Sequence, residues 1–225
     1  MKKGWWLLEL KGYREKNELA TYYLFDYDNL PAIKQELKDD FEWLKEEPEY
    51  SCSIGDEGPG ESKINFDKFR EIQQQVEVEL PKAFLYFIET ESLQYKIRSC
   101  TDCYLDLADR AVKVKGEQEG FIIHFLSDSQ WCLHWYLYIG KAGGHFIVVS
   151  SNAYGFNIDD DEDFSASYNK TEISFEEEDI WFCSFTFTEF IYRFWIENEI
   201  WFSLSLDNVP LTPLQQDYVN HYLSK

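Results

Sequence analysis

The sequence has little positive charge and no long apolar run. Lysine and arginine total 21 residues against 42 aspartates and glutamates, so the formal net charge is −21. A surface of this charge repels phosphate, which makes nucleic acids and anionic membranes poor partners. No apolar run reaches the roughly 18 residues that a membrane-spanning helix needs. We therefore predict no nucleic-acid or membrane partner. The charge favours a cationic partner, although solubility alone would also explain it.

Signals for export and for disulfide bonds are also weak. The apolar residues 5–8 are too few for the core of a signal peptide, and the charged Glu9 and Lys11 follow closely. Five cysteines is an odd number in a chain that is rich in other core residues, which favours reduced thiols. We therefore expect a cytoplasmic protein.

Motifs of common active sites are missing. The chain contains no G-x-S-x-G elbow, H-E-x-x-H pair, Walker loop or G-x-G-x-x-G. Asp159, Asp161 and Asp163 have the alternate spacing of a calcium loop. However, Phe164 stands where the loop needs glycine, and Lys170 stands where it needs glutamate. We predict that the protein is not an enzyme and carries no cofactor.

Cysteines and histidines near the middle of the chain provide the alternative, a metalloprotein or an enzyme. Cys100 and Cys103 form a C-x-x-C pair that could join Cys132 and His134 as four zinc ligands. His124 and His134 lie in neighbouring predicted strands, where they could face each other as acid and base. Such histidines more often pack or hydrogen-bond, and we favour that interpretation.

Core-forming residues are abundant, with 44% hydrophobic and 18% aromatic residues. This composition supports a large buried core and excludes disorder of the whole chain. Alternation with period two predicts strands, and apolar spacings of three and four predict helices. The clearest predicted strands are 5–10, 21–27, 121–126, 131–139 and 145–150. The predicted helices are 31–46 and 66–75, and three more that begin near residues 81, 186 and 212.

Two of the helix starts have a capping box, in which two side chains satisfy free backbone N–H groups. Thr186 and Glu189 form the first, with Phe185 and Phe190 at the positions of a hydrophobic staple. The second lies in residues 212–215. The pattern after Thr186 predicts an amphipathic helix with one buried face.

A polar break, residues 127–130, separates two strongly apolar segments and predicts a hairpin turn. The period-two phase places Trp131 and Trp135 on one buried face. His124 and His134 fall on the other face. We therefore interpret this stretch as the structural centre of the domain.

Glycine and proline gather in residues 48–63, which makes this segment the best linker candidate. We place the principal boundary there. This gives an N-terminal extension, residues 1–60, with strands and one helix, and a main domain, residues 61–225. The sequence leaves open whether the extension packs on the main sheet.

Acidic residues are concentrated in residues 157–179, where Lys170 is the only base. Such blocks repel themselves and usually form solvated loops. We predict that a protein partner binds to two clusters in this segment. They are Asp159, Asp160, Asp161, Glu162 and Asp163, and Glu176, Glu177, Glu178 and Asp179.

Short motifs in a fixed order resemble the SUKH superfamily, which includes yeast cell-wall-assembly regulators of the Smi/Knr type and many bacterial immunity proteins. A Leu-Pro pair opens a helix, a polar turn is followed by tryptophan, and a phenylalanine-rich helix comes late. The matching residues are Leu80, Pro81, Asp128, Gln130, Trp135, Phe185, Glu189 and Phe190. The resemblance covers roughly residues 64–223. The Asn-Gly that often follows the first helix is absent here.

The resemblance implies an α+β fold, with a mainly antiparallel sheet flanked by helices, and a binding role without chemistry. Bacterial members neutralise toxins, often nucleases, whose active surfaces are basic because they bind phosphate. A charge of −21 suits such a partner. The first hypothesis is therefore an immunity protein that blocks a basic toxin domain. The alternative is a regulatory scaffold of the cell-wall-assembly type, and the third is the Cys/His metalloprotein or enzyme.

Overall fold

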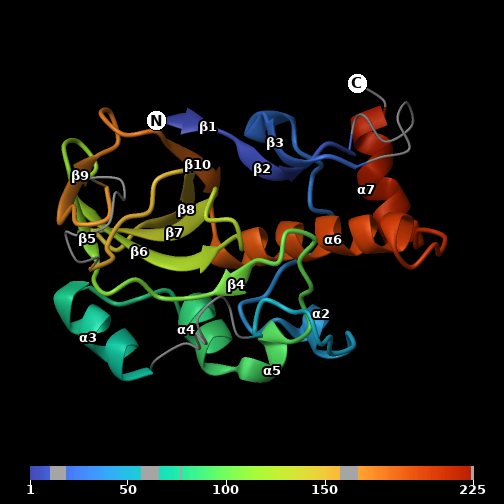
Figure 1. Ribbon diagram of the computed structural model, residues 1–225, viewed down its shortest axis with the longest axis horizontal. Helices are drawn as coiled ribbons and strands as arrows, with labels where there is room; N and C mark the ends of the chain where they lie inside the picture. The colour runs from blue at the N-terminus through green and yellow to red at the C-terminus, as the bar shows by residue number, and fades with distance from the viewer. Residues whose placement is uncertain (11–18, 57–65, 77, 158–166, 224–225) are drawn as a thin grey trace.

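The computed structural model describes residues 1–10, 19–56, 66–76, 78–157 and 167–223, and it has the predicted α+β architecture (Figure 1). The strands are β1 (Lys2–Lys3), β2 (Trp5–Leu8), β3 (Thr21–Phe25), β4 (Tyr104–Leu105), β5 (Val112–Lys115), β6 (Gly120–Ser127), β7 (His134–Gly140), β8 (His145–Ser150), β9 (Glu172–Ser174) and β10 (Ile180–Ser184). The helices are η2 (Tyr27–Asn29, a 3-10 turn), α2 (Glu42–Lys45), α3 (Phe66–Val76), α4 (Lys82–Glu89), α5 (Glu91–Gln94), α6 (Phe187–Ser205) and α7 (Pro213–Leu223). None of these helices is long and apolar enough to cross a membrane.

The main sheet has the strand order β1-β10-β8-β7-β6-β5-β9, and β4 also pairs with β6. The centre is the antiparallel meander β6–β7–β8, whose two hairpins confirm the predicted turns at 127–130 and 140–144. β1 and β9 join the two edges as parallel strands. All seven residues of β7 are buried, so the central strand is covered on both faces. Polar residues within it therefore need partners inside the protein.

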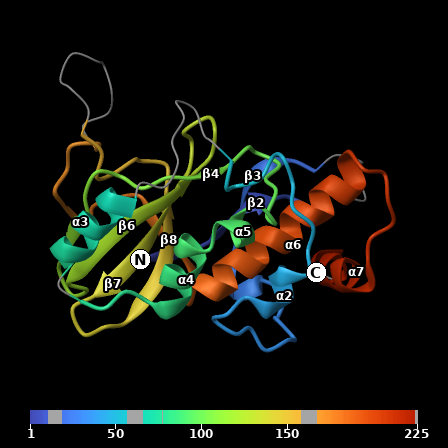
Figure 2. The same cartoon turned by 90° about the horizontal axis from the view of Figure 1, so that it is seen from below.

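Different parts of the chain cover the two faces of the sheet (Figures 1 and 2). On one face, the rings of Phe84 in α4 and Phe187 in α6 pack against Phe125 of β6, at centroid distances of 5.9 and 5.4 Å. On the other face, Tyr136 packs against Tyr154, which lies in the long connection between β8 and β9. The sheet is therefore the middle layer of the domain.

Helix α6 begins at the predicted capping box, where the Glu189 N–H donates to the Thr186 hydroxyl at 3.0 Å. The predicted staple is not formed. Phe185 is 57% exposed, and its ring lies against Tyr27 and Phe182. The helix is also buried on more than the one predicted face, because the sheet, α4, the β2–β3 hairpin and α7 surround it (Figure 1).

The helix predicted for residues 31–46 is wrong except for its last turn, α2. Phe41 has a left-handed backbone with φ of +51°, which a continuing helix does not allow. Polar groups of α6 also bind this segment, because Arg193 Nη1 donates to the Pro31 carbonyl at 2.9 Å and the Thr188 hydroxyl donates to Asp39 at 2.9 Å. Tertiary contacts therefore override the local helical pattern.

Ser53 and Ile54, within the predicted linker, are buried in the protein. The Ile54 N–H donates to the Ile97 carbonyl at 2.8 Å, and the Ile54 side chain is 1% exposed. Residues 57–63 lie outside the described part of the chain. Strand β1 extends the main sheet, and β2 contributes Trp5 to the same core as α6. The described residues before the predicted boundary therefore contribute to the main sheet and to the core around its long helix.

The remaining predicted helices agree with the structure apart from their ends. α3 spans the predicted 66–75 and one further residue. Pro81 stands immediately before α4 rather than in its first turn. The second capping box is present before α7, where the Thr212 N–H donates to Gln215 Oε1 at 2.8 Å and the Gln215 N–H donates to the Thr212 hydroxyl at 3.3 Å.

Candidate functional site

One of the two predicted acidic clusters, residues 159–163, lies outside the described part of the chain. The other follows β9 in a turn, and its first two members, Glu176 and Glu177, are exposed. The hydroxyl of Ser174 donates to Glu176 at 2.5 Å and lowers the pKa of that carboxyl. Glu176 therefore keeps its charge in mildly acidic solution.

The last two members of this cluster have partners within the protein. Glu178 accepts a hydrogen bond from the Tyr154 hydroxyl at 2.9 Å and is ion-paired with Lys170. Asp179 accepts one from the Trp181 indole at 3.1 Å, and Lys2 lies 3.6 Å away. These contacts fix the turn before β10. Glu176, Glu177 and Asp179 are therefore the described members that present charge to the solvent.

The cysteines and histidine of the alternative zinc site do not assemble. Cys103 is buried while Cys132 is exposed, and no three His, Cys, Asp or Glu side chains among the described residues are placed to hold a metal. Burial raises the pKa of Cys103 to about 12 and raises that of Cys100 further. Protonated thiols are poor metal ligands and poor nucleophiles.

His124 and His134, in contrast, do come together across β6 and β7. The Ser127 hydroxyl lies 2.8 Å from His124 Nε2 and 2.8 Å from His134 Nδ1. It can donate to one ring only, so the other ring must donate to it. All three side chains are at most 1% exposed. Serine beside histidine is a nucleophile–base pair, but neither cavity described below is lined by these residues. We interpret the cluster as a hydrogen-bonded part of the core.

Trp131 covers this cluster, contrary to the prediction that it shares the face of Trp135. Its backbone is left-handed, with φ of +57°, so β7 begins only at His134. The Trp131 ring therefore turns back to the histidine side, where it lies 5.4 Å from the ring of His134 and 5.3 Å from that of Phe156.

We expect His134 to weaken the fold in acid. Burial lowers its pKa from 6.5 to about 4, so the unfolded chain takes up a proton first as the pH falls. This costs about 2 kcal/mol of unfolding free energy by pH 5. Urea unfolding of the wild type and of His134→Gln at pH 7 and pH 5 measures it. The unfolding free energy of the variant should lie below that of the wild type at pH 7, and this difference should shrink by about 2 kcal/mol at pH 5. An unchanged difference would contradict the lowered pKa of His134.

The motif residue Asp128 is fully buried and organises the turn between β6 and β7. Its carboxylate accepts the Leu133 N–H at 2.6 Å and the Gln130 N–H at 3.0 Å. It also accepts the Tyr22 hydroxyl at 2.8 Å, which ties the turn to the β2–β3 hairpin. The Gln130 side chain is exposed. Asp128 therefore has a structural role, as do the buried Leu80, Trp135 and Phe190.

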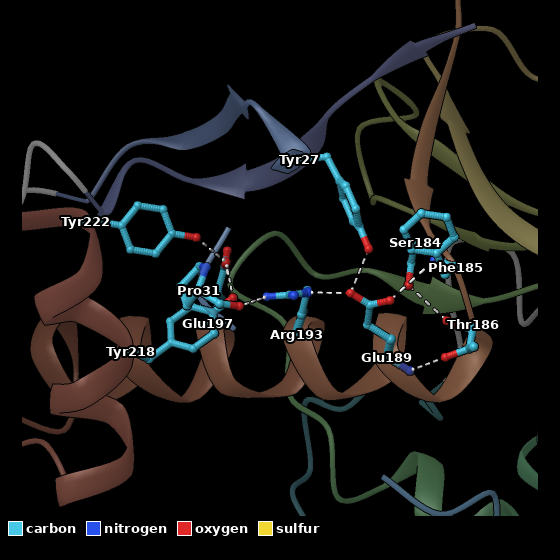
Figure 3. A network of polar contacts seen from close by, with 10 residues as sticks. All are labelled: Tyr27, Pro31, Ser184, Phe185, Thr186, Glu189, Arg193, Glu197, Tyr218 and Tyr222. Carbon is cyan, nitrogen blue, oxygen red and sulfur yellow. Dashed lines mark hydrogen bonds and ion pairs between the residues drawn. The ribbon is translucent and has the colours of Figure 1, made fainter. Parts of the chain in front are cut away.

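A chain of polar groups runs along the buried side of α6 (Figure 3). Glu189 accepts the Tyr27 hydroxyl at 2.8 Å and Arg193 Nε at 3.0 Å. Arg193 continues to the Pro31 carbonyl. These bonds join α6 to η2 and to the segment that follows it. The charges are paired inside the protein, so the network stabilises one arrangement of these elements.

One turn further along, Glu197 joins α6 to α7 (Figure 3). Its Oε1 accepts the Tyr218 hydroxyl at 2.9 Å and the Tyr222 hydroxyl at 3.3 Å. Its Oε2 has no partner among the described residues. Burial raises the pKa of Glu197 to about 7, although the tyrosine hydroxyls and the charge of Arg193 oppose the shift.

A cavity of about 560 Å³ opens beside this network, between residues 31–35 and α7. The rings of Tyr192 and Tyr218 line it, so Tyr218 both forms its wall and binds Glu197. Lys34 and Asp217 form an ion pair of 2.7 Å among the lining residues. A cavity of this size holds a large side chain or a small molecule. A second cavity, about 510 Å³, lies between residues 78–82 and 141–145.

The sequence did not indicate the first cavity, because its walls come from segments about 180 residues apart. The helical pattern predicted for 31–46 would even have placed Lys34 on a regular helix. A search of family models, curated proteins and solved structures finds no match to this chain.

Proposed function

We propose that this protein is a binding protein without catalytic activity that neutralises a basic toxin domain, of the nuclease type, by covering its cationic surface. The proposal combines the resemblance to immunity proteins with the charge of the chain. The net charge of −21 suits a partner whose own surface is selected to bind phosphate.

The observation that carries the proposal is the distribution of charge. Most lysines and arginines in the described residues are already ion-paired with acids of the same molecule, so many exposed carboxylates are left without an internal cation. The paired bases are Lys2, Lys3, Lys34, Lys45, Lys68, Arg70, Arg98, Lys115, Lys141, Lys170 and Arg193.

Such a surface acts first on the rate of encounter. Complementary charges steer two proteins together and raise the association rate, and salt screens the effect within about 10 Å at 0.1 M. Exposed carboxylates that have no internal partner, such as Glu177, are the groups that a cationic partner meets first. The affinity then depends on groups that become desolvated in the complex.

Neutralising five acids of the two predicted clusters should slow this encounter. The changes are Asp159→Asn, Asp161→Asn, Asp163→Asn, Glu176→Gln and Glu177→Gln. With a basic nuclease toxin domain as the partner, we expect the association rate at low salt to fall about tenfold and its dependence on salt to flatten. Stopped-flow kinetics at several ionic strengths measures both quantities.

The matched control removes five exposed charges from α3, α4 and the residues after α2. It carries Glu46→Gln, Glu49→Gln, Asp67→Asn, Glu71→Gln and Glu89→Gln. Equal effects of the two variants would show that net charge acts without a preferred site. An unchanged rate and salt dependence in the first variant would remove both clusters from the contact surface. Failure of the wild type to bind would contradict the proposed function itself.

A further inference from the structure

Exposed apolar side chains are concentrated in residues 206–214, which comprise the connection between α6 and α7 and the first two residues of α7. Leu206 is 61% exposed, Val209 47% and Leu214 43%, and they are among the most exposed large hydrophobic side chains of the described residues. Pro210 and Pro213 between them are exposed as well. A cluster of exposed apolar residues on one short segment marks a contact surface more often than scattered single residues do.

This connection has a fixed shape. The N–H groups of Leu206 and Asp207 both donate to the Phe202 carbonyl, and the Val209 N–H donates to the Ser203 carbonyl at 3.0 Å. Asp207 is also ion-paired with the buried Arg98 at 2.9 Å. The capping box at 212–215 fixes the other end. A preorganised apolar segment loses little conformational entropy when a partner binds.

The cavity beside α7 continues this surface, because Leu214 belongs to both. Tyr192 and Tyr218 are almost fully buried in its wall, and the Asp217 carboxylate is open to solvent at its edge. Among the described residues, only Lys34 is ion-paired with that carboxylate, and the Lys34 and Asp217 side chains are 78% and 61% exposed. Such a surface pair contributes little. Arginine from outside can replace Lys34, because a guanidinium binds carboxylate in a bidentate manner.

We propose that the basic partner docks on residues 206–214 and places an arginine side chain in this cavity, against Asp217. The inference rests on the proposed function and adds where the partner is held. The acidic clusters then control the rate of encounter. The apolar connection and the cavity control how long the complex lasts.

The first test is the triple variant Leu206→Ser/Val209→Ser/Leu214→Ser, which leaves the net charge unchanged. Surface plasmon resonance with a catalytically inactive form of the same nuclease toxin domain gives both rate constants. We expect the dissociation rate to rise at least about 100-fold, while the association rate and its salt dependence stay within about threefold. The matched control is Tyr23→Ser/Tyr86→Ser, which removes two side chains that are each 37% exposed elsewhere.

A second test changes the cavity alone and has effects of opposite sign. Asp217→Asn should weaken binding about tenfold. Lys34→Met should strengthen it a few-fold, because it frees Asp217 for the incoming arginine. Asp28→Asn is the matched control, since Asp28 is held by Lys3 in an exposed pair of 3.0 Å. Circular dichroism checks the fold of every variant.

The outcomes separate the two proposals. A wild type that does not bind the toxin domain contradicts the proposed function, and this inference falls with it. A wild type that binds, with a triple variant that dissociates no faster than the tyrosine control, overturns the docking site and leaves the proposed function standing. If the triple variant does not fold, equal affinities of the Asp217→Asn and Lys34→Met variants overturn the docking site.

Discussion

Replacing Arg98 by alanine is expected to lower the free energy of unfolding by about 3–5 kcal/mol. Arg98 is almost fully buried, and its Nε and Nη2 donate to the two carboxylate oxygens of Glu199, each at 2.9 Å. Its guanidinium also lies over the rings of Tyr50 and Phe202, at 4.6 and 4.2 Å. The alanine variant leaves a buried carboxylate without its cation, which is the costly part of breaking a buried pair.

Urea unfolding at pH 7 measures this cost, with two comparisons. Arg98→Lys keeps the charge but loses the bidentate geometry, so an intermediate loss is expected. The double variant Arg98→Met/Glu199→Leu removes both charges and should recover much of the stability. If the double variant were as unstable as Arg98→Ala, packing of the arginine side chain rather than the unpaired charge of Glu199 would explain the loss.

Above neutral pH, Glu197→Gln is expected to stabilise the protein by about 3 kcal/mol. Burial raises the pKa of Glu197 from 4.5 to about 7, so the folded protein binds this proton more tightly than the unfolded chain does. The wild type therefore loses stability as the pH rises from about 4.5 to 7, and a shift of this size corresponds to about 3 kcal/mol. Glutamine has no charge to lose and still offers an oxygen to Tyr218 and Tyr222.

Urea unfolding of the wild type and the variant between pH 4 and pH 8 tests this expectation. The two should agree within about 1 kcal/mol at pH 4, where the wild-type carboxyl is neutral, and then diverge as the pH rises. Glu71→Gln on α3 changes an exposed carboxylate and should keep a constant difference from the wild type. A constant difference for Glu197→Gln as well would show that folding does not raise the pKa of Glu197.

Local patterns in the sequence predicted the elements whose causes are local. Period two located the β6–β7–β8 meander, and the capping box located the start of α6 to the residue. Both signals arise between residues at most a few positions apart. The α+β class followed from these elements, and the structure confirms it.

The candidate sites were predicted less well. The acidic residues of the two clusters could be named from the sequence, because charge density is a property of sequence. The meeting of His124 and His134 at Ser127 was only one of the alternatives considered, since it depends on the register of two strands. The cavity between residues 31–35 and α7 was missed, because no local pattern in the sequence indicates a space between segments that are far apart.

The sequence by itself determined the excess of negative charge, the apolar strands and the helix starts, because each depends on composition or on neighbouring residues. Only the tertiary structure decided that residues 31–41 are not helical, that α6 is buried on several sides, and that a cavity lies beside Tyr218. The physical reason is the same in each case. Contacts between distant segments, such as Arg193 with Pro31 and Tyr218 with Glu197, outweigh the small local preference for a helix.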